Sequence, residues 1–261
     1  MVSLQQKTVL ITGASSGIGA ACARAFAQAG TSLVLLARRQ ERLETLQQQL
    51  QERYGSDTVI VVSDVAQREK VTRAFKSLPR RWQAVDILVN NAGLALGVDN
   101  EWEARPQDID AMIDVNVKGL LTLTGLCIPG MIERGLGHVI NLGSIAGQEP
   151  YPTGSVYCAT KFAVRALSRG LKMDLLGTPV RVTSIDPGLV QTEFSAVRFY
   201  GDKTRAEAVY EGLTPLTAED IAEAVLFAAT RPAHVNISEM LILSIDQAAA
   251  RMVHRQKGPE D

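Results

Sequence analysis

Cysteine and histidine are scarce in this chain, and neither is arranged for the chemistry that usually needs it. Three cysteines (Cys22, Cys127 and Cys158) lie far apart among 261 residues. An odd and scattered set is neither a disulfide framework nor a zinc site, and it is typical of a reducing compartment. The three histidines show no metal-ligand spacing. We therefore expect no metal site and a cytoplasmic location.

The chain also lacks a charge excess, a long apolar run and the features of a signal peptide. Its net charge is −1 at pH 7, which gives no electrostatic reason to bind nucleic acid or an anionic membrane. No apolar run approaches the length of a membrane span, and residues 1–6 have no basic or apolar leader region. The expected partner is a small molecule, with neither nucleic acid nor membrane involved.

The composition is that of a globular protein with a large core. Hydrophobic residues make up 46% of the chain and charged residues 21%. A length of 261 residues suits one α/β domain, and there is no repeat, low-complexity tract or linker that would divide it. We expect a single dinucleotide-binding and catalytic domain over residues 1–261, with a polar tail from residue 251 that is partly disordered at its end.

Apolar strands alternate with amphipathic helices along the whole sequence. Strands are predicted at residues 7–12, 31–37, 58–63, 86–90, 138–143, 180–185 and 239–244, and helices at 20–28, 41–52, from about 67, 107–131, 155–176 and 218–230. Because the strands are apolar on both faces, they predict a parallel sheet covered by helices on both sides. In such a doubly wound, Rossmann-like α/β fold, ligands bind at the carboxyl ends of the strands, where the strand order reverses.

A glycine-rich turn joins the first strand to the first helix. Its sequence runs from Thr12 to Gly19, with Gly13, Ser15, Ser16, Gly17, Ile18 and Gly19 as candidate contacts. A glycine turn at a helix N-terminus lets the backbone approach a diphosphate and aims free N–H groups at it. The spacing is Gly-x-x-x-Gly-x-Gly, and its strand–turn–helix setting makes a dinucleotide site the preferred interpretation.

Two arginines close the second strand, where the choice between NAD and NADP is usually made. An acidic residue there binds the ribose 2′-hydroxyl of NAD, whereas arginine suits the 2′-phosphate of NADP. Arg38 and Arg39 occupy this position, and Glu41 comes later, in the predicted helix. The alternative is that both arginines are solvated surface groups. We predict NADP as the cofactor.

Three further polar positions follow strand ends or interrupt a helix. Asp64 is expected to accept a hydrogen bond from the adenine amino group, to cap the helix that begins near Gln67, or to do both. Asn91-Ala92-Gly93 would let the chain pass close to the adenosine. Asn116 lies in the middle of a predicted helix, where asparagine is unfavourable, so it needs a partner, most simply a tertiary hydrogen bond.

A tyrosine and a lysine form the centre of the predicted chemistry. Tyr157 and Lys161 lie one helical turn apart, so a nearby ammonium would favour the phenolate. Because free tyrosine has a pKa of about 10, work near neutral pH needs help worth about 4 kcal/mol. Ser144, at the end of a buried strand, would hold a carbonyl oxygen for the tyrosine to protonate. The alternative is a surface pair on an ordinary amphipathic helix.

Together these motifs resemble the short-chain dehydrogenase/reductase family over almost the whole chain. The matching stretches are Thr12-Gly13-x-x-x-Gly17-Ile18-Gly19, Asn90-Asn91-Ala92-Gly93, Asn116, Ser144, Tyr157-x-x-x-Lys161 and Pro187-Gly188. The resemblance implies a catalytic tetrad of Asn116, Ser144, Tyr157 and Lys161. In it Tyr157 is the general acid/base, Ser144 binds the substrate oxygen, Lys161 holds the nicotinamide ribose and lowers the tyrosine pKa, and Asn116 holds a water.

The resemblance also extends the expected cofactor contacts and suggests a subfamily. It adds Val65, Pro187, Gly188, Val190 and Thr192, the last beside the carboxamide. Residues 86–97, 192–199 and 232–237 are similar to the NADP-dependent 3-hydroxy-acid dehydrogenases, which oxidise serine and allo-threonine. The alternatives are an NADPH-dependent reductase of sulfoacetaldehyde, a 3-oxoacyl thioester or a sugar, and a non-catalytic NADP-binding sensor, which would not need Ser144, Tyr157 and Lys161.

Substrate binding and assembly are the last expectations. Residues 193–212 have weak periodicity and follow a strand end, which favours a substrate lid. A hydroxy acid needs a cation, and Arg198 is the first candidate, with Arg205 and Lys203 next; alternatively Arg198 only holds the lid or a subunit contact. By resemblance, and because the helices that carry Asn116 and Tyr157 have surplus apolar faces, we expect a homotetramer.

Overall fold

A seven-stranded parallel sheet forms the centre of the molecule. The computed structural model describes residues 2–256, and its strands pair in the order β3-β2-β1-β4-β5-β6-β7. The strands are β1 (Thr8–Thr12), β2 (Ser32–Ala37), β3 (Thr58–Val62), β4 (Ile87–Asn90), β5 (Gly137–Leu142), β6 (Val180–Pro187) and β7 (Glu239–Ile242). The order reverses between β1 and β4, which confirms the predicted doubly wound, Rossmann-like sheet.

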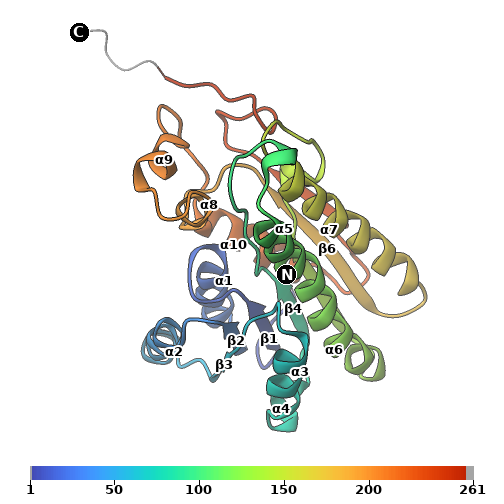
Figure 1. Ribbon diagram of the computed structural model, residues 1–261. Helices are drawn as coiled ribbons and strands as arrows, with labels where there is room; N and C mark the ends of the chain where they lie inside the picture. Colours follow the sequence, from blue (N-terminus) through green and yellow to red (C-terminus); the bar gives the residue numbers. More distant parts are fainter. Residues whose placement is uncertain (1, 257–261) are drawn as a thin grey trace.

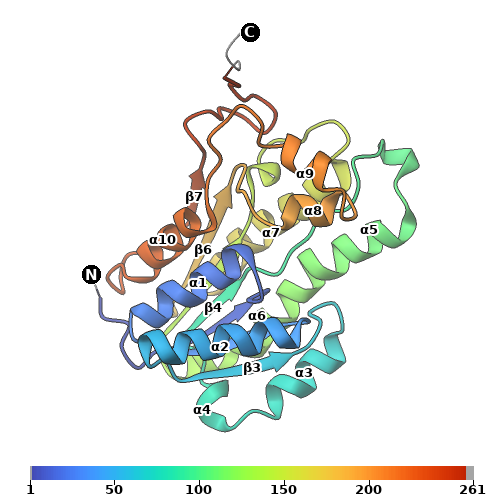
Figure 2. The ribbon, with the colours of Figure 1, turned by 90° about the vertical axis from the view of Figure 1, so that its left-hand side faces the viewer.

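Helices cover both faces of this sheet (Figure 1, Figure 2). They are α1 (Gly17–Gln28), α2 (Gln40–Tyr54), α3 (Arg68–Lys76), α4 (Arg80–Gln83), α5 (Pro106–Ile113), α6 (Leu120–Glu133), α7 (Ser155–Asp174), α8 (Phe194–Arg198), α9 (Lys203–Ala208) and α10 (Ala218–Ala229). Three short turns, η1 (Glu101–Glu103), η2 (Asp114–Gly119) and η3 (Ile145–Gly147), complete the helical elements. The predicted strands and long helices all form, within about three residues of the expected bounds.

Two apolar layers hold the helices to the sheet. One joins the sheet to α1, α2 and α10, with Phe26, Leu43 and Ile221 fully buried. The other joins it to α3 and α6, with Leu123 and Met131 fully buried. Since burying one such side chain stabilises the fold by about 1.5–3 kcal/mol, these layers fix where the strand ends lie.

One helix is longer and more apolar than the sequence analysis expected. α5, the π-turn η2 and α6 run on without a break from Pro106 to Glu133, 28 residues with a mean hydropathy of 1.4 over the best window. Among the described residues this helix alone is long and apolar enough to cross a membrane, which corrects the expectation that no segment approaches that length. Half of the window is buried inside the fold, as in the core helix of a globular domain.

The predicted lid consists of two short helices above the carboxyl end of the sheet. α8 and α9 lie on this side of the molecule in both ribbon views (Figure 1, Figure 2). The described part of the tail lies against the segment that follows α9, because the backbone N–H of Gln256 donates to the carbonyl of Gly212 at 2.6 Å. The predicted disorder of the chain end falls on residues 257–261, outside the described residues.

Candidate active site

A cavity of about 310 Å³ opens at the carboxyl ends of the strands. It collects most of the residues predicted to bind a dinucleotide. Its lining includes Gly13, Ser15, Ser16, Gly17, Ile18, Arg38, Arg39, Asp64, Val65, Asn91, Ala92, Gly93, Ser144, Tyr157, Lys161, Pro187, Gly188, Val190 and Thr192. Three predicted residues do not line it: Gly19, Asn116 and Arg198.

The glycine turn is packed so closely that side chains are excluded from it. Gly13 has φ +65°, and a Cβ there would lie 3.0 Å from the Cα of Ala92. A Cβ on Gly19 would lie 2.4 Å from the carbonyl oxygen of Gly13, so Gly19 lies beneath the turn rather than in the cavity. The Asn91 side chain donates to the Thr12 carbonyl at 2.9 Å and ties the turn to β4. These close approaches leave a cradle that fits a dinucleotide diphosphate.

The N-terminus of α1 presents unpaired backbone donors to this cradle. Ser16 is the N-cap residue, has an extended backbone and makes no side-chain capping bond. The first-turn N–H groups of the helix therefore remain available to an anion, together with the positive end of the helix dipole.

The arginine end of the cavity contains a cluster of arginine, serine and glutamate side chains, of which only some members were predicted. The Arg39 guanidinium donates to the hydroxyls of Ser15 at 3.0 Å and Ser16 at 2.5 Å. It also donates to Glu193 at 2.9 Å, and Arg42 donates to both oxygens of the same carboxylate at 2.7 and 2.8 Å. These two guanidiniums hold the pKa of Glu193 below its usual range. Arg42 and Glu193 were not predicted, because their contact spans 151 residues of sequence.

Asp64 does not cap the following helix, so that alternative is wrong. Helix α3 begins at Arg68, with Gln67 at its N-cap. Asp64 lies too far upstream to reach the free N–H groups, and its carboxylate accepts from the backbone N–H of Ala66 at 3.0 Å instead. Its other oxygen lies 3.7 Å from the exposed Arg38 guanidinium. Asp64 remains free to contact an adenine amino group.

Ser144, Tyr157 and Lys161 converge at the far end of the same cavity. The Lys161 ammonium donates to the Leu142 carbonyl at 2.8 Å and lies 5.9 Å from the centre of the Tyr157 ring. The Ser144 hydroxyl accepts from the backbone N–H of Ala146 at 3.1 Å, which fixes it at the start of turn η3. The predicted helix face therefore carries the tyrosine and lysine toward the serine.

Burial dominates the protonation of Tyr157 and Lys161. Burial raises the pKa of Tyr157 well above its ordinary value, and the neighbouring Ser144 side chain and the charge of Arg198 offset it only in part. Burial also lowers the pKa of Lys161 to about 8. Burial outweighs the groups that oppose it in the free protein, and the role of Lys161 in lowering the tyrosine pKa stays a prediction.

Asn116 has the tertiary partners that its position in a helix required. In turn η2 its side-chain oxygen accepts from the Leu94 N–H, and its amide donates to the Leu94 carbonyl, both at 2.8 Å. The amide also donates to Thr160 on α7 at 3.0 Å. A Cβ on Gly93 would lie 3.4 Å from Asn116 Oδ1 and 3.6 Å from Lys161 Nζ. Asn116 thus joins the end of β4 to the helix that carries Tyr157 and Lys161.

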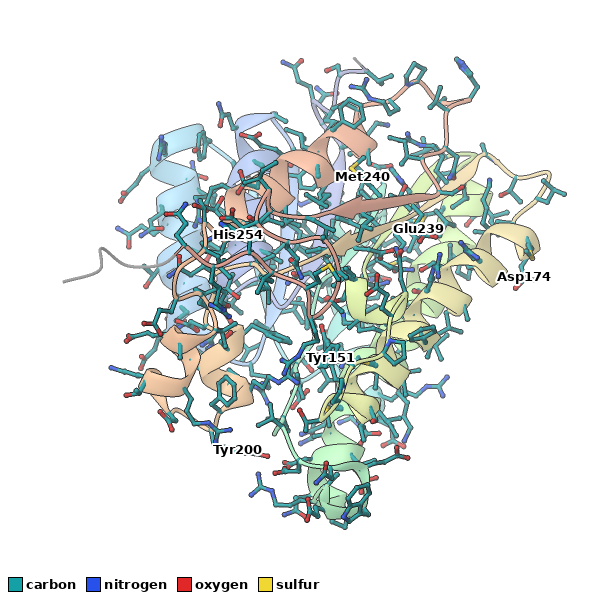
Figure 3. All side chains as sticks on the ribbon, turned by 90° about the horizontal axis from the view of Figure 1, so that it is seen from above. Tyr151, Asp174, Tyr200, Glu239, Met240 and His254 are labelled. Atoms are coloured by element: carbon teal, nitrogen blue, oxygen red, sulfur yellow. The ribbon has the colours of Figure 1, made fainter. Side chains whose placement is uncertain are left out.

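Arg198 faces a second, smaller cavity of about 20 Å³ rather than the main one. Tyr157 lines both cavities. The Arg198 guanidinium donates to the Tyr151 hydroxyl at 3.0 Å and to the Gly97 carbonyl at 3.3 Å. Tyr151, which the sequence analysis missed, lies over the middle of the molecule when it is seen from above, whereas Tyr200 lies at its rim (Figure 3). Lys203 and Arg205 are exposed on α9.

Helix α8 connects the two ends of the site. Glu193, its N-cap residue, is held by Arg39 and Arg42, and Arg198 is its last residue. Between them the Phe194 ring lies 5.6 Å from the Tyr157 ring, centre to centre. The arrangement offers an anion-binding end, a proton donor held beside a hydroxyl, and a guanidinium beyond it. No metal-ligating cluster occurs among residues 2–256.

Comparison with known proteins gives consistent matches. The sequence profile of a family described as short chain dehydrogenase matches residues 7–201. The NADP-dependent 3-hydroxy acid dehydrogenase YdfG of Salmonella typhi is 48% identical over 249 residues, 95% of this chain and 99% of that protein. Sulfoacetaldehyde reductase 2 of Chromohalobacter salexigens is 45% identical over 92% of this chain and 95% of that protein. A solved structure, the closed form of serine dehydrogenase complexed with NADP+, superposes with a TM-score of 0.88 at 48% identity, covering 95% of this chain and all of that chain.

Proposed function

The chain belongs to the short chain dehydrogenase family, and from this premise we propose that it is an NADP-dependent oxidoreductase of small 3-hydroxy acids such as serine or allo-threonine. The observation that carries the proposal is the convergence of Ser144, Tyr157 and Lys161 in a cavity whose other end holds arginines. Residues 1–261 would act as one dinucleotide-binding and catalytic domain, with residues 193–212 as its lid. The similarity to a 3-hydroxy acid dehydrogenase along 95% of the chain supports this activity.

NADP fits the residues of the main cavity. The first turn of α1 and the glycine turn would receive the diphosphate, and Ser15, Arg38 and Arg39 the 2′-phosphate. Asp64, Val65, Asn91, Ala92 and Gly93 would surround the adenosine. The residues from Pro187 to Thr192 would meet the nicotinamide. When bound, the nicotinamide supplies the hydride acceptor for oxidation or the hydride donor for reduction.

The remaining chemistry is a proton transfer that this chain's own residues perform. Burial keeps Tyr157 protonated in the free protein, so its phenol is ready to donate to a carbonyl oxygen held by Ser144. In the oxidation direction the phenolate must form, and the Lys161 ammonium stabilises it. Asn116 holds turn η2 against α7 through its bond to Thr160. We propose that it also binds a water in the proton relay.

The acid group of the substrate would be bound beyond Tyr157. Arg198 is held by Tyr151 and Gly97 at a place where its charge reaches the Tyr157 hydroxyl. A guanidinium in this position suits a carboxylate or a sulfonate. A reductase of sulfoacetaldehyde is therefore the second candidate, supported by the 45% identity to such an enzyme. A thioester, a sugar or a purely sensory role has less support, because none of them requires a carboxylate or sulfonate beside the reacting carbon for this arginine to bind.

We further propose that the protein is a cytoplasmic homotetramer with no nucleic-acid or membrane partner. Exposed apolar side chains follow α6 and α7: Leu121 is 46%, Ile132 43%, Phe162 39% and Met173 74% exposed. Pairing these helices across a two-fold axis would bury them. Light scattering at micromolar concentration tests the assembly, and a monomer would refute it.

The activity is tested by a screen with purified protein. Serine, allo-threonine, 3-hydroxybutyrate and uncharged alcohols of similar size would be offered with NADP+ and with NAD+. The reverse direction would be assayed with sulfoacetaldehyde and NADPH. We expect NADP+-linked oxidation of at least one hydroxy acid, and absence of turnover with every compound would overturn the proposal.

A further inference from the structure

One face of α7 carries three basic side chains at intervals of four residues, and acids from two strands face it. Lys161, Arg165 and Arg169 form the row. Glu239 of β7 pairs with Arg165 and with Arg169, each at 2.9 Å. In Figure 3 Glu239 lies on the strand beside the ribbon of α7. The outer two members of the row are therefore paired at the edge of the sheet.

The innermost acid, Asp186, is buried at the carboxyl end of β6 and is only 1% exposed. One of its oxygens accepts from the Ser184 hydroxyl at 2.6 Å and the other from the Gln148 amide at 3.1 Å. The same Gln148 nitrogen donates to Glu239 at 2.9 Å. Both hydrogen-bond partners of Asp186, Ser184 and Gln148, are neutral. The cost of burying the Asp186 carboxylate must therefore be offset by a positive charge nearby.

Lys161 and Asp186 approach the same end of the β5–β6 pairing from different elements. Its ammonium donates to the carbonyl of Leu142, and Leu142 pairs in register with Ile185, the residue before Asp186. A Cβ on Gly143 would lie 1.9 Å from an oxygen of Asp186. The carboxylate therefore lies against the backbone between the acceptor of Lys161 and the catalytic Ser144.

We propose that Asp186 is a positioning residue that acts through Lys161: its buried carboxylate keeps the lysine ammonium charged in a site that otherwise favours the neutral amine. This inference rests on the proposed function of Lys161 and adds the residue that maintains its charge. Burial lowers the pKa of Lys161 to about 8, and the charge of Asp186 is what raises it. Reciprocally, burial raises the pKa of Asp186 and the lysine charge lowers it.

Few other titratable groups face Lys161 and Asp186. Tyr157 adjoins Lys161 on α7, and its pKa lies far above the range in which the lysine titrates. Glu239, from β7, raises the pKa of Asp186 and is itself neutralised by Arg165 and Arg169. Turn η3 contributes Ser144 and Gln148, and η2 contributes Asn116, all of them uncharged. Asp186 is thus the acid that controls the charge of Lys161.

The sign of the expected effect follows directly. A lysine is charged below its pKa and loses the charge as the pH rises through it. Removing the Asp186 charge lowers the lysine pKa further, so the loss of function at alkaline pH moves to lower pH. An opposite charge within about 4–6 Å shifts a pKa by about 1–3 units, and a more distant charge shifts it by less. We expect Asp186→Asn to move the alkaline limb down by about half a unit or more.

The experiment follows kcat/KM and NADPH binding from pH 6 to 10 in Asp186→Asn, Asp186→Glu and Glu239→Gln. We expect the alkaline limb of both measurements to shift in Asp186→Asn and to be restored in Asp186→Glu. Glu239→Gln removes a charge from the same network and should lower the thermal midpoint without moving the limb. If Asp186→Asn does not fold, Asp186→Ser serves in its place.

A purely structural role for Asp186 predicts the reverse result. Asp186→Asn would then lower the thermal midpoint while its alkaline limb coincided with that of the wild type, and the proposal would be overturned. The NADPH titration needs no substrate, so it decides the question even if the hydroxy-acid activity is absent. A wild type that binds no NADPH at any pH would instead contradict the proposed function.

Discussion

Glu193 accepts a hydrogen bond at 2.9 Å from Arg39, the same guanidinium that donates to the hydroxyls of Ser15 and Ser16. A carboxylate from the predicted lid therefore engages the arginine that is expected to meet the cofactor's 2′-phosphate. A doubly charged phosphate in this place must share Arg39 with Glu193 or displace it. Cofactor binding and the start of α8 are thus linked through one ion pair.

Glu193→Gln should strengthen NADP+ binding, because it removes the anion that competes for Arg39. Both side chains are almost half exposed, so the gain corresponds to a surface ion pair, about two- to fivefold in the dissociation constant. NAD+ lacks the 2′-phosphate and should bind as before. Calorimetric titration of both dinucleotides measures the effect. Glu219→Gln, which breaks an exposed pair with Arg24 on α1, is the matched control.

Loss of the arginines should abolish the preference for NADP. The wild type is expected to bind NADP+ at least about tenfold more tightly than NAD+, about 1.4 kcal/mol. Arg39→Ala removes the guanidinium that two serine hydroxyls hold in place, and Arg38→Asp introduces a repulsive charge. Each should bring the two affinities together, as measured by NADPH and NADH fluorescence. Equal affinities in the wild type would contradict the assignment of the cofactor.

Tyr157→Phe should remove catalysis without removing the cofactor. The phenyl ring keeps the contact with Phe194, but the proton that reaches the substrate oxygen is gone, at an expected cost of about 10²–10⁴ in kcat. NADPH should still bind. Lys161→Ala should weaken both turnover and binding. Near-normal turnover in Tyr157→Phe would show that another group transfers the proton.

Arg198→Ala should raise KM for a hydroxy acid far more than for an uncharged alcohol of similar size. The lost group is a charge-assisted, bidentate partner for a carboxylate, worth about 1.5–3 kcal/mol, or about 10–150-fold. Lys203→Ala, which removes an exposed cation from the same lid, controls for a general change in charge. If both substrates lose equally, Arg198 only shapes the lid through Tyr151 and Gly97.

The sheet and the glycine turn could be predicted because their signals are local. A β-rich run from Thr8 to Thr12 before Gly13 and an amphipathic run after Gly19 specify strand, turn and helix without any distant contact. The pairs Glu193–Arg39, Arg198–Tyr151 and Asp186–Gln148 could not be predicted, since each joins segments separated by 38 residues or more. The raised pKa of Tyr157 was missed for a related reason: spacing on a helix reveals the neighbouring charge, whereas burial depends on the whole fold.

Helix α8 has a practical consequence for redesign. Its N-cap carboxylate pairs with an arginine of the predicted cofactor end, and its last residue lies at the predicted substrate end, although the helix has only five residues. An engineer who replaces Arg39 to convert the enzyme to NAD leaves Glu193 with Arg42 as its remaining arginine partner, at the start of the helix that ends in Arg198. Variants with a changed cofactor should therefore also be selected for activity on the substrate. Cofactor and substrate specificity depend on residues at the two ends of one short helix, so a change in one is expected to affect the other.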